Sequence, residues 1–483
     1  MRVFEIIVIL ADLAVAGGIL YIRKNRRLDA GLLTFSVLAL LLHGIIEHFR
    51  IQMVPAYAVS LALIIVLIRR LVKPGGIIKP RSLLKKSLLS IVVLVFAGVS
   101  VGLSILLPVF TMPEPTGSYA IGTVSRHLTD ESRQETLSSD PDDKRELMVN
   151  IWYPVDRNQA VGKPKEHYPS EVGEAISLVF GIPKLVFSHV TEIPTHVVYG
   201  AELSAAENKY PVLLFSPGVR STRFQSMTAI EELVSHGYIV VGMDHPYTSA
   251  KVEYPDGRAV FYEPDPAYPT SAEVYEQNVK GVGIRVADAR FVLDMITKWN
   301  ENDPDHMFEG KLDLERVGIF GHSYGGATTA EAMAQDSRFK AGVSLEGGFW
   351  GTVSHTGLKQ PFMYLMTGGT AESLQPTTVK KDKVFYEEFA PDLDSVMTKS
   401  TNDTYYLTID HFFHQSFTDI ALLAPAMFAK EMSAEHNIDI TRSYVRAFFD
   451  QYLKDERQDL LEGPSSDYPE VQFDGKYTKR RVQ

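Results

Sequence analysis

Cysteine is absent from the 483-residue sequence. Its absence excludes disulfide bonds, thiolate metal sites and a cysteine nucleophile. The zinc signature H-E-x-x-H is missing as well, and the 14 histidines show no paired spacing that is typical of metal ligands. We therefore expect a protein that works without a metal or another cofactor.

Basic residues are scarce over most of the chain. Residues 111–483 hold 35 Lys and Arg against 55 Asp and Glu, a balance of −20, whereas residues 1–110 hold 13 against 4, a balance of +9. Nucleic-acid binding relies on basic patches, so the acidic part argues against a nucleic-acid partner. We interpret the basic and apolar N-terminal part as embedded in membrane lipid, and the acidic part as soluble.

Four apolar runs occupy this N-terminal part, and a helix needs about 20 apolar residues to cross the hydrocarbon core. The first and fourth runs are long enough alone, while the second and third need flanking residues. The first is not a simple signal peptide, because its basic cluster follows the run instead of preceding it. The runs are Val3–Ile22, Ala30–Ile46, Met53–Ile68 and Leu88–Phe110.

The basic clusters predict the orientation of these helices. One cluster covers residues 23–27 and the other residues 69–86, and both fall on one side of the membrane if all four runs cross. Basic loops tend to remain in the cytoplasm. We therefore expect a multi-pass protein of the cell membrane, with its large C-terminal part on the extracytoplasmic side.

Asp12 lies in the middle of the first run, where a charge is costly. One interpretation is a proton- or ligand-linked site. The other is a neutral or paired carboxyl group that packs the helices, near His43 or His48. We favour the second, because no other carboxylate lies at the middle of a run.

The acidic part is expected to begin with a polar linker over residues 111–143 and to end in a loose polar tail over 458–483. Between them, over 144–457, buried strands alternate with helices, which predicts an α/β fold with a mostly parallel central sheet. The expected strands are Leu147–Tyr153, Val212–Ser216, Tyr238–Met243, Val317–Phe320, Ala341–Leu345, Phe362–Met366 and Tyr405–Ile409, and the expected long helices are Ala272–Asn300 and Ser443–Lys454.

The segment 168–198 interrupts this alternation and is apolar in stretches. Long insertions in compact domains are often functional. A lid or a membrane-facing helix pair is therefore one interpretation, and an ordinary packing insertion is the other.

Ser323 lies in Gly321-His322-Ser323-Tyr324-Gly325, a G-x-S-x-G motif. A strand precedes it and a helix follows, which is the context of a nucleophile elbow. A serine hydroxyl is a weak nucleophile that must be exposed beside a base. The motif and its context predict an α/β-hydrolase fold with Ser323 as the nucleophile of an esterase or lipase.

The partners of the serine should follow it in the order acid, then histidine. Glu346 ends the next predicted strand and is the candidate acid. His411 and His414 follow a later strand and are both candidate bases, with His355 a weaker one. Asp244-His245-Pro246 precedes the serine, and we interpret it as structural.

An oxyanion hole needs two backbone N–H groups. We expect one from Tyr324, which follows the nucleophile, and the other from Val219 in the loop after the strand at residue 212.

The sequence resembles the platelet-activating-factor acetylhydrolases of the isoform II and plasma type. The matching segments, in order, are Pro115-Thr116-Gly117, Ile121-Gly122-Thr123, Arg145–Pro154, Leu214–Gly218, Ser235–Tyr238, Asp244-His245-Pro246, Gly321–Gly326, Glu346 and His414–Asp419. They extend across nearly all of residues 113–420. The membrane part has no counterpart in the secreted plasma enzyme.

This resemblance implies that Ser323 is the nucleophile and that His414, in an H-Q-x-F motif, is the base. The family acid is typically Asp, whereas this chain has Glu346, so Asp410 and Asp419 remain alternatives. The resemblance also implies calcium-independent hydrolysis of short or oxidised acyl esters of phospholipids. An esterase for other small or polyester-like substrates, or an inactive receptor module, are the alternatives.

Overall fold

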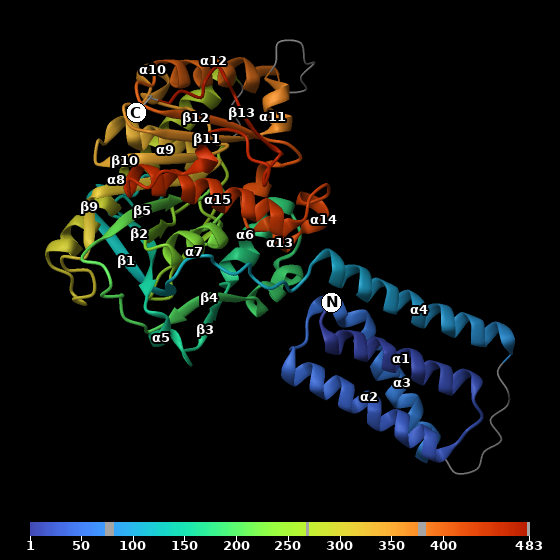
Figure 1. Ribbon diagram of the computed structural model, residues 1–483. Coiled ribbons are helices and arrows are strands. Elements are labelled where there is room, and N and C mark those ends of the chain that lie inside the picture. Colours follow the sequence, from blue (N-terminus) through green and yellow to red (C-terminus); the bar gives the residue numbers. More distant parts are fainter. Residues whose placement is uncertain (73–81, 267–269, 375–382, 481–483) are drawn as a thin grey trace. The chain divides into compact units, whose positions relative to one another are not determined.

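The computed structural model describes residues 1–72, 82–266, 270–374 and 383–480. The chain forms two compact units (Figure 1). The helical unit consists of Met1–Phe110 and Pro183–Glu192, and the sheet unit consists of Thr111–Ile182 and Ile193–Gln483.

The helical unit contains four long helices that run alongside one another (Figure 1). All four are long and apolar enough to cross a membrane, and many of their Leu, Ile and Val side chains face outward. The two shorter apolar runs are lengthened by flanking residues, as expected. The helices are α1 (Val3–Tyr21), α2 (Arg26–Ile46), α3 (Val54–Val72) and α4 (Leu83–Leu106), and the 3₁₀ turn η1 (Ile51–Met53) precedes α3.

The partner of Asp12 differs from the expected one. The hydroxyl of Ser60 donates to both carboxylate oxygens of Asp12, at 2.7 and 2.9 Å. His43 instead contacts Tyr57 and Glu47. The carboxyl group therefore joins α1 to α3 through a hydroxyl. The spacing of residues in the sequence does not show which helix supplies the partner of Asp12.

The sheet unit is built on an 11-stranded sheet in the order β13-β12-β11-β10-β9-β5-β6-β2-β1-β4-β3. Its central strands β12, β11, β10, β9, β5 and β6 are mutually parallel. The strand bounds are β1 (Ala120–Gln134), β2 (Lys144–Val155), β3 (Lys165–His167), β4 (Pro194–Tyr199), β5 (Tyr210–Ser216), β6 (Ile239–Met243), β9 (Leu312–His322), β10 (Phe339–Leu345), β11 (Phe362–Thr367), β12 (Thr404–Ile409) and β13 (Val471–Phe473); β7 (Lys251–Glu253) and β8 (Ala259–Phe261) form a separate hairpin.

Two segments that the sequence predicts as irregular belong to this sheet. The middle of the expected linker 111–143 is β1, which pairs antiparallel with β2 over most of its length. Within the expected tail 458–483, β13 pairs antiparallel with β12. Both are polar because antiparallel strands toward the edge of a sheet keep solvated positions. The linker and the loose tail are therefore wrong as predictions of structure.

Alternate side chains of the central strands pack on opposite faces of the sheet. Val212 and Ile319 join the core that contains the apolar side of α8 and α9. On the other face, Phe320 contacts Phe449 of α15, with their ring centres 6.0 Å apart. The longer helices of the unit are α6 (Ser170–Phe180), α7 (Met227–Ser235), α8 (Ser271–Glu301), α9 (Tyr324–Gln335), α12 (Lys383–Lys399) and α15 (Ala434–Leu453); the shorter ones are α5 (Arg157–Ala160), α10 (Val353–Thr356), α11 (Gly368–Ser373), α13 (Ile420–Leu423) and α14 (Pro425–Phe428).

The insertion 168–198 contributes to both units. It leaves the sheet after β3 and returns at β4, which pairs with β3. Its first half forms α6 in the sheet unit, and its second half, the 3₁₀ segment η2 (Lys184–Glu192), belongs to the helical unit. There the Gln52 amide donates to Val186 O at 2.7 Å.

Candidate active site

Ser323 occupies the sharp turn between β9, which ends at His322, and α9, which begins at Tyr324. Its backbone has φ 56° and ψ −121°, which is a strained conformation for a residue other than glycine. The Ser323 N–H donates to Leu345 O of the neighbouring strand at 2.8 Å. The turn therefore has the strained strand-to-helix geometry that exposes a serine at the end of a sheet.

The glycines of the motif allow this turn to pack. A Cβ on Gly325 would lie 1.8 Å from Ser216 O, and one on Gly321 would lie 2.4 Å from the carbonyl carbon of Gly325. Distances this short are incompatible with any side chain. The turn therefore requires glycine at both positions, so that β5 and the start of α9 can approach each other.

His414 and Glu346 are brought together from different parts of the sheet. Glu346 follows β10, has φ 54°, and accepts from the Thr367 hydroxyl at 2.7 Å and the Thr367 N–H at 3.1 Å. Its other oxygen lies 2.7 Å from His414 Nδ1. Burial by itself would raise the pKa of Glu346, but hydrogen bonding and charge from His414, with the Thr367 hydroxyl, hold it below its ordinary value.

The alternative acids and bases contact other partners. His411 contacts Glu431, and His355 lies in the short helix α10; neither lines the cavity beside Ser323. Asp410 accepts from Gln472, and the carboxylate of Asp419 accepts from Tyr168 and Thr228. Among the candidates, the pair with a direct carboxylate–imidazole contact beside Ser323 is Glu346 with His414.

Ser323 and His414 line one cavity of about 340 Å³. Val219 lies in the same wall. One side of the cavity is apolar and comes from α6 and α13, with Val172, Ala175, Ile176, Val179, Ile420 and Leu423 in its lining. The first half of the insertion thus contributes to the wall of the cavity, whereas the second half belongs to the other unit. The lid interpretation stays a prediction.

His322 and Gln225 form a link that the sequence does not reveal. The Gly218 N–H donates to Gln225 Oε1 at 2.9 Å, and Gln225 Nε2 lies 3.0 Å from His322 Nδ1. His322 Nε2 donates to the carbonyl oxygen of His414 at 2.7 Å. Burial and the nearby His414 hold the pKa of His322 well below its ordinary value. A neutral His322 thus connects the loop of Val219 to the backbone of His414.

Asp419 is fully buried beside the cavity and anchors Tyr168, which precedes α6. The Tyr168 hydroxyl donates to its carboxylate at 2.6 Å. Burial raises the pKa of Asp419 to about 6, although the hydrogen bonds from Thr228 and Tyr168 oppose this shift. The carboxyl group therefore ties the start of the insertion to α7 and α13, and burial disfavours its charged form relative to that of an exposed aspartate.

We expect Asp419→Asn to change how stability depends on pH. The pKa of Asp419 in the folded protein, about 6, lies above the ordinary 3.8. The protonated carboxyl group therefore stabilises the folded state fully below about pH 4, and this contribution to stability is lost as the pH rises through 6. The loss amounts to roughly 3 kcal/mol. Asparagine does not titrate, so the melting temperature of Asp419→Asn should exceed that of the wild type at pH 7.5 and approach it at pH 4. If the melting temperatures of the two proteins depended on pH in the same way, the raised pKa of Asp419 would be contradicted.

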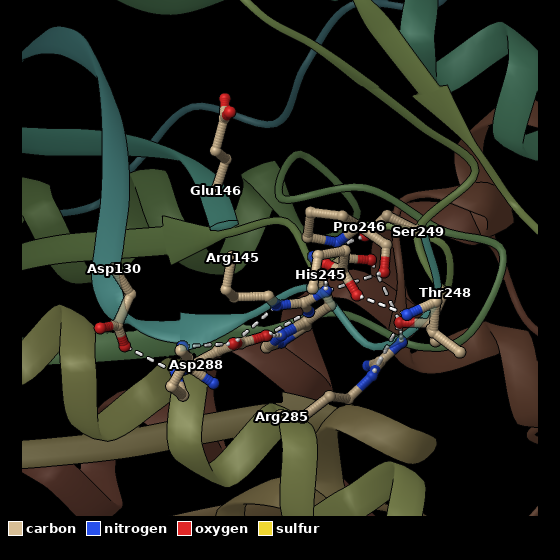
Figure 2. Close-up of polar contacts among 12 residues, drawn as sticks. Asp130, Arg145, Glu146, His245, Pro246, Thr248, Ser249, Arg285 and Asp288 are labelled. Atoms are coloured by element: carbon tan, nitrogen blue, oxygen red, sulfur yellow. Dashed lines mark hydrogen bonds and ion pairs between the residues drawn. The ribbon is translucent and has the colours of Figure 1, made fainter. Parts of the chain in front are cut away.

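A second Ser–His–Asp arrangement, made of Ser216, His245 and Asp288, is buried at the end of β5, and Figure 2 shows its His245 and Asp288. His245 Nδ1 lies 2.8 Å from Asp288, and its Nε2 lies 2.9 Å from the hydroxyl of Ser216. Arg145 donates two hydrogen bonds to Asp288, at 2.6 and 3.0 Å. All three members are fully buried and outside the cavity lining. This agrees with a structural role for Asp244-His245-Pro246, since Ser216 ends β5 and fixes the start of the loop.

No three His, Asp or Glu side chains of the described residues lie close enough together to hold a metal ion. The cavity lining includes Ser323 and His414, and His414 contacts the carboxylate of Glu346. This set of groups suits acyl transfer through a serine.

The fold is shared with a solved esterase. The ferulic acid esterase from Streptomyces cinnamoneus superposes with a TM-score of 0.60, and it is 28% identical over 76% of this chain and 99% of its own. The fold and the site thus define an α/β-hydrolase that acts on carboxylic esters.

The model of the family described as platelet-activating factor acetylhydrolase, isoform II, matches residues 106–454. The chain belongs to this family. A probable 1-alkyl-2-acetylglycerophosphocholine esterase from Arthroderma benhamiae is 26% identical over 75% of this chain and 94% of its own length. The platelet-activating factor acetylhydrolase from Cavia porcellus is 24% identical over 73% and 81%.

Proposed function

We propose that the protein is a membrane-anchored serine hydrolase that cleaves short or oxidised acyl esters of phospholipids through an acyl-enzyme. The single observation that carries the proposal is the 2.7 Å contact of His414 with Glu346 beside the elbow serine, in one cavity with Ser323. The family and its phospholipid-esterase relatives support the substrate class.

The reaction would proceed in two steps. Ser323 Oγ attacks the ester carbonyl carbon while its proton passes to Nε2 of His414, since Nδ1 is held by Glu346. The N–H groups of Val219 and Tyr324 bind the oxyanion. The proton moves to the alkoxide, and the alcohol leaves. Water then attacks the acyl-enzyme with His414 as base, which releases the carboxylic acid and restores Ser323.

The apolar wall from α6 and α13 would accept the acyl or alkyl chain of the substrate.

We further propose that α1 to α4 cross the cell membrane and that the sheet unit lies outside the cytoplasm, since the basic clusters at residues 23–27 and 69–86 share one side. Because the chain has no cysteine, single cysteines in exposed loops of the sheet unit can report this directly. Labelling by a membrane-impermeant maleimide on intact cells supports the orientation, and labelling only after lysis contradicts it.

The substrate is tested on the full-length protein in detergent. Phosphatidylcholines with acetyl, pentanoyl or palmitoyl groups at the second position are compared with 4-nitrophenyl butyrate and methyl ferulate. Preference for the short-chain phospholipids is the expected result. Turnover of the nitrophenyl or ferulate ester with indifference to phospholipid would replace the proposed substrate by a small ester. Failure of a fluorophosphonate probe to label the protein would overturn the serine mechanism.

A further inference from the structure

Arg220 follows Val219 in the chain, and Arg285 donates to the carbonyl oxygen of Pro217 in the same loop. Among the described residues, neither arginine forms an ion pair with a carboxylate. Four other arginines of the sheet unit that stack on aromatic rings, Arg126, Arg133, Arg223 and Arg258, each also contact a carboxylate. The two exceptions are Arg220, at the rim of the cavity, and Arg285, beneath the loop. This part of the chain has an excess of acidic residues. Two arginines at one loop that form no ion pair with a carboxylate are therefore unexpected.

Arg220 is exposed and lines the cavity that contains Ser323. Its φ of 60° is a left-handed conformation that side-chain-bearing residues seldom adopt. The Arg220 N–H donates to Thr248 O at 2.9 Å, which holds this conformation. A strained residue directly after Val219, in the wall of the cavity, is typical of a site where the backbone serves function.

The guanidinium of Arg220 is held in place without being neutralised. Its central carbon lies 4.8 Å from the centre of the Tyr262 ring, and one nitrogen donates to the Tyr262 hydroxyl at 3.3 Å. Tyr262 lines the same cavity. Among the described residues of this lining, Arg220 is the one Lys or Arg side chain. Its remaining N–H donors are therefore available to a substrate.

We propose that Arg220 forms an anion subsite that binds a phosphate or carboxylate group of the ester substrate. A planar guanidinium binds both groups through paired hydrogen bonds. The anion has two possible sources, a phosphate on the alcohol side or a terminal carboxylate on an oxidised acyl chain. This assignment rests on the proposed esterase function and names the charge of its substrate.

Two matched substrate pairs separate these sources. Dibutyroyl phosphatidic acid against dibutyroylglycerol tests the alcohol side, and the 4-nitrophenyl half-ester of glutaric acid against 4-nitrophenyl pentanoate tests the acyl side. The measured quantity is the ratio of kcat/KM for the anionic and the neutral member. Arg220→Gln should lower this ratio about five- to tenfold in one pair, and Arg220→Lys should lower it less, because lysine keeps the charge but not the paired hydrogen bonds.

Arg258→Gln is the matched control, because Arg258 is also exposed and stacked on a tyrosine, but lies outside the cavity lining. Its ratios should equal those of the wild type. Unchanged ratios in Arg220→Gln for both pairs would overturn the subsite. Absence of hydrolysis of these four esters, of the phosphatidylcholines and of 4-nitrophenyl butyrate and methyl ferulate by the wild type would overturn the esterase function instead.

Arg285 carries a second and independent inference. It extends from α8, is fully buried, and donates to Pro217 O at 2.6 Å. It also donates to the Thr248 hydroxyl at 2.8 Å (Figure 2). Its central carbon also lies 4.9 Å from the centre of the Tyr324 ring. One guanidinium therefore contacts both segments that supply the predicted oxyanion donors, Val219 and Tyr324.

We infer that Arg285 is a positioning residue for the oxyanion hole. Its bond to Pro217 O fixes the peptide that leads to Val219, and its contact with Tyr324 fixes the start of α9. Burial lowers the pKa of Arg285 to about 10, so that it remains a cation at neutral pH. A fixed positive charge behind the two N–H groups favours the negative charge that develops in the transition state.

The test compares Arg285→Met and Arg285→Lys with Arg126→Met. Arg126 is a matched control because it is a largely buried arginine stacked on Trp299, far along the chain from the site. Measured quantities are kcat, KM, the inhibition constant of a trifluoromethyl ketone that forms a tetrahedral adduct, and the melting temperature. Arg285→Met should lower kcat and inhibitor affinity by about 100-fold, with a much smaller change in KM.

Arg285→Lys keeps the charge, and its kcat and inhibitor affinity should fall by about tenfold. This variant tests the positioning role if the methionine variant does not fold. Arg126→Met should lower only the melting temperature. Wild-type kcat and inhibitor affinity in a folded Arg285 variant would overturn the positioning role. Fluorophosphonate labelling of the wild type separates this outcome from failure of the serine mechanism on which the inference rests.

Discussion

Replacing Ser323 by alanine is expected to lower kcat for ester hydrolysis by about 10⁵-fold, with the protein still folded. The magnitude follows from loss of the covalent step, which leaves only binding and oxyanion stabilisation. Alanine removes one hydroxyl at the elbow, so that the melting temperature should change little. The measurement is kcat with the best ester of the substrate panel, together with fluorophosphonate labelling.

Ser443→Ala is the control, because Ser443 is a partly buried serine on α15 that bonds to Tyr468. It should keep both activity and labelling. Hydrolysis that persists in Ser323→Ala would show that another group carries the reaction. The buried Ser216 would then need to be tested as well.

Glu346→Gln is expected to lower kcat by about 10³- to 10⁴-fold. Glutamine keeps the size of the side chain and its bond to Thr367, but it does not stabilise the imidazolium of His414, and it can present its amide N–H₂ to Nδ1. The wrong tautomer of His414 then follows. The measurement is kcat across the pH range in which the wild type is active.

Glu346→Asp separates charge from reach. Aspartate keeps the charge, but its shorter side chain lengthens the 2.7 Å contact with His414, so that an intermediate loss is expected. Asp410→Asn should retain activity, because Asp410 bonds to Gln472. A larger loss in Asp410→Asn than in Glu346→Gln would move the acid to the position after β12.

The features that the sequence predicts well are those with a local signal. Long apolar runs define α1 to α4, and a buried apolar strand before G-x-S-x-G defines the turn at Ser323. The acid is harder to predict, because Glu346 and His414 are 68 residues apart and several carboxylates follow the serine. Their contact depends on where β10 and β12 end in the sheet. The order of residues in the chain limits the candidates for the acid but does not identify it.

Other features have no local signal. The strand β1 is polar because one side of it is solvated, so its composition resembles that of a linker. The contact between Arg145 and Asp288 joins residues that are 143 positions apart, and the link from Gln225 to His322 spans 97. Buried polar pairs of this kind form only when the tertiary structure brings distant segments together. The pattern of apolar residues in the sequence therefore does not predict them.

The path of the insertion has a practical consequence for dissecting the protein. The chain passes between the two units after Phe110, after Ile182 and after Glu192, so that removing residues 1–110 does not remove the helical unit completely. A chain that begins at Thr111 still carries η2, and Val186 and His189 lose their contacts with Gln52. A soluble esterase therefore requires two edits: deletion of the first four helices and replacement of residues 183–192 by a polar linker. A single cut at the end of α4 leaves an apolar segment that favours aggregation.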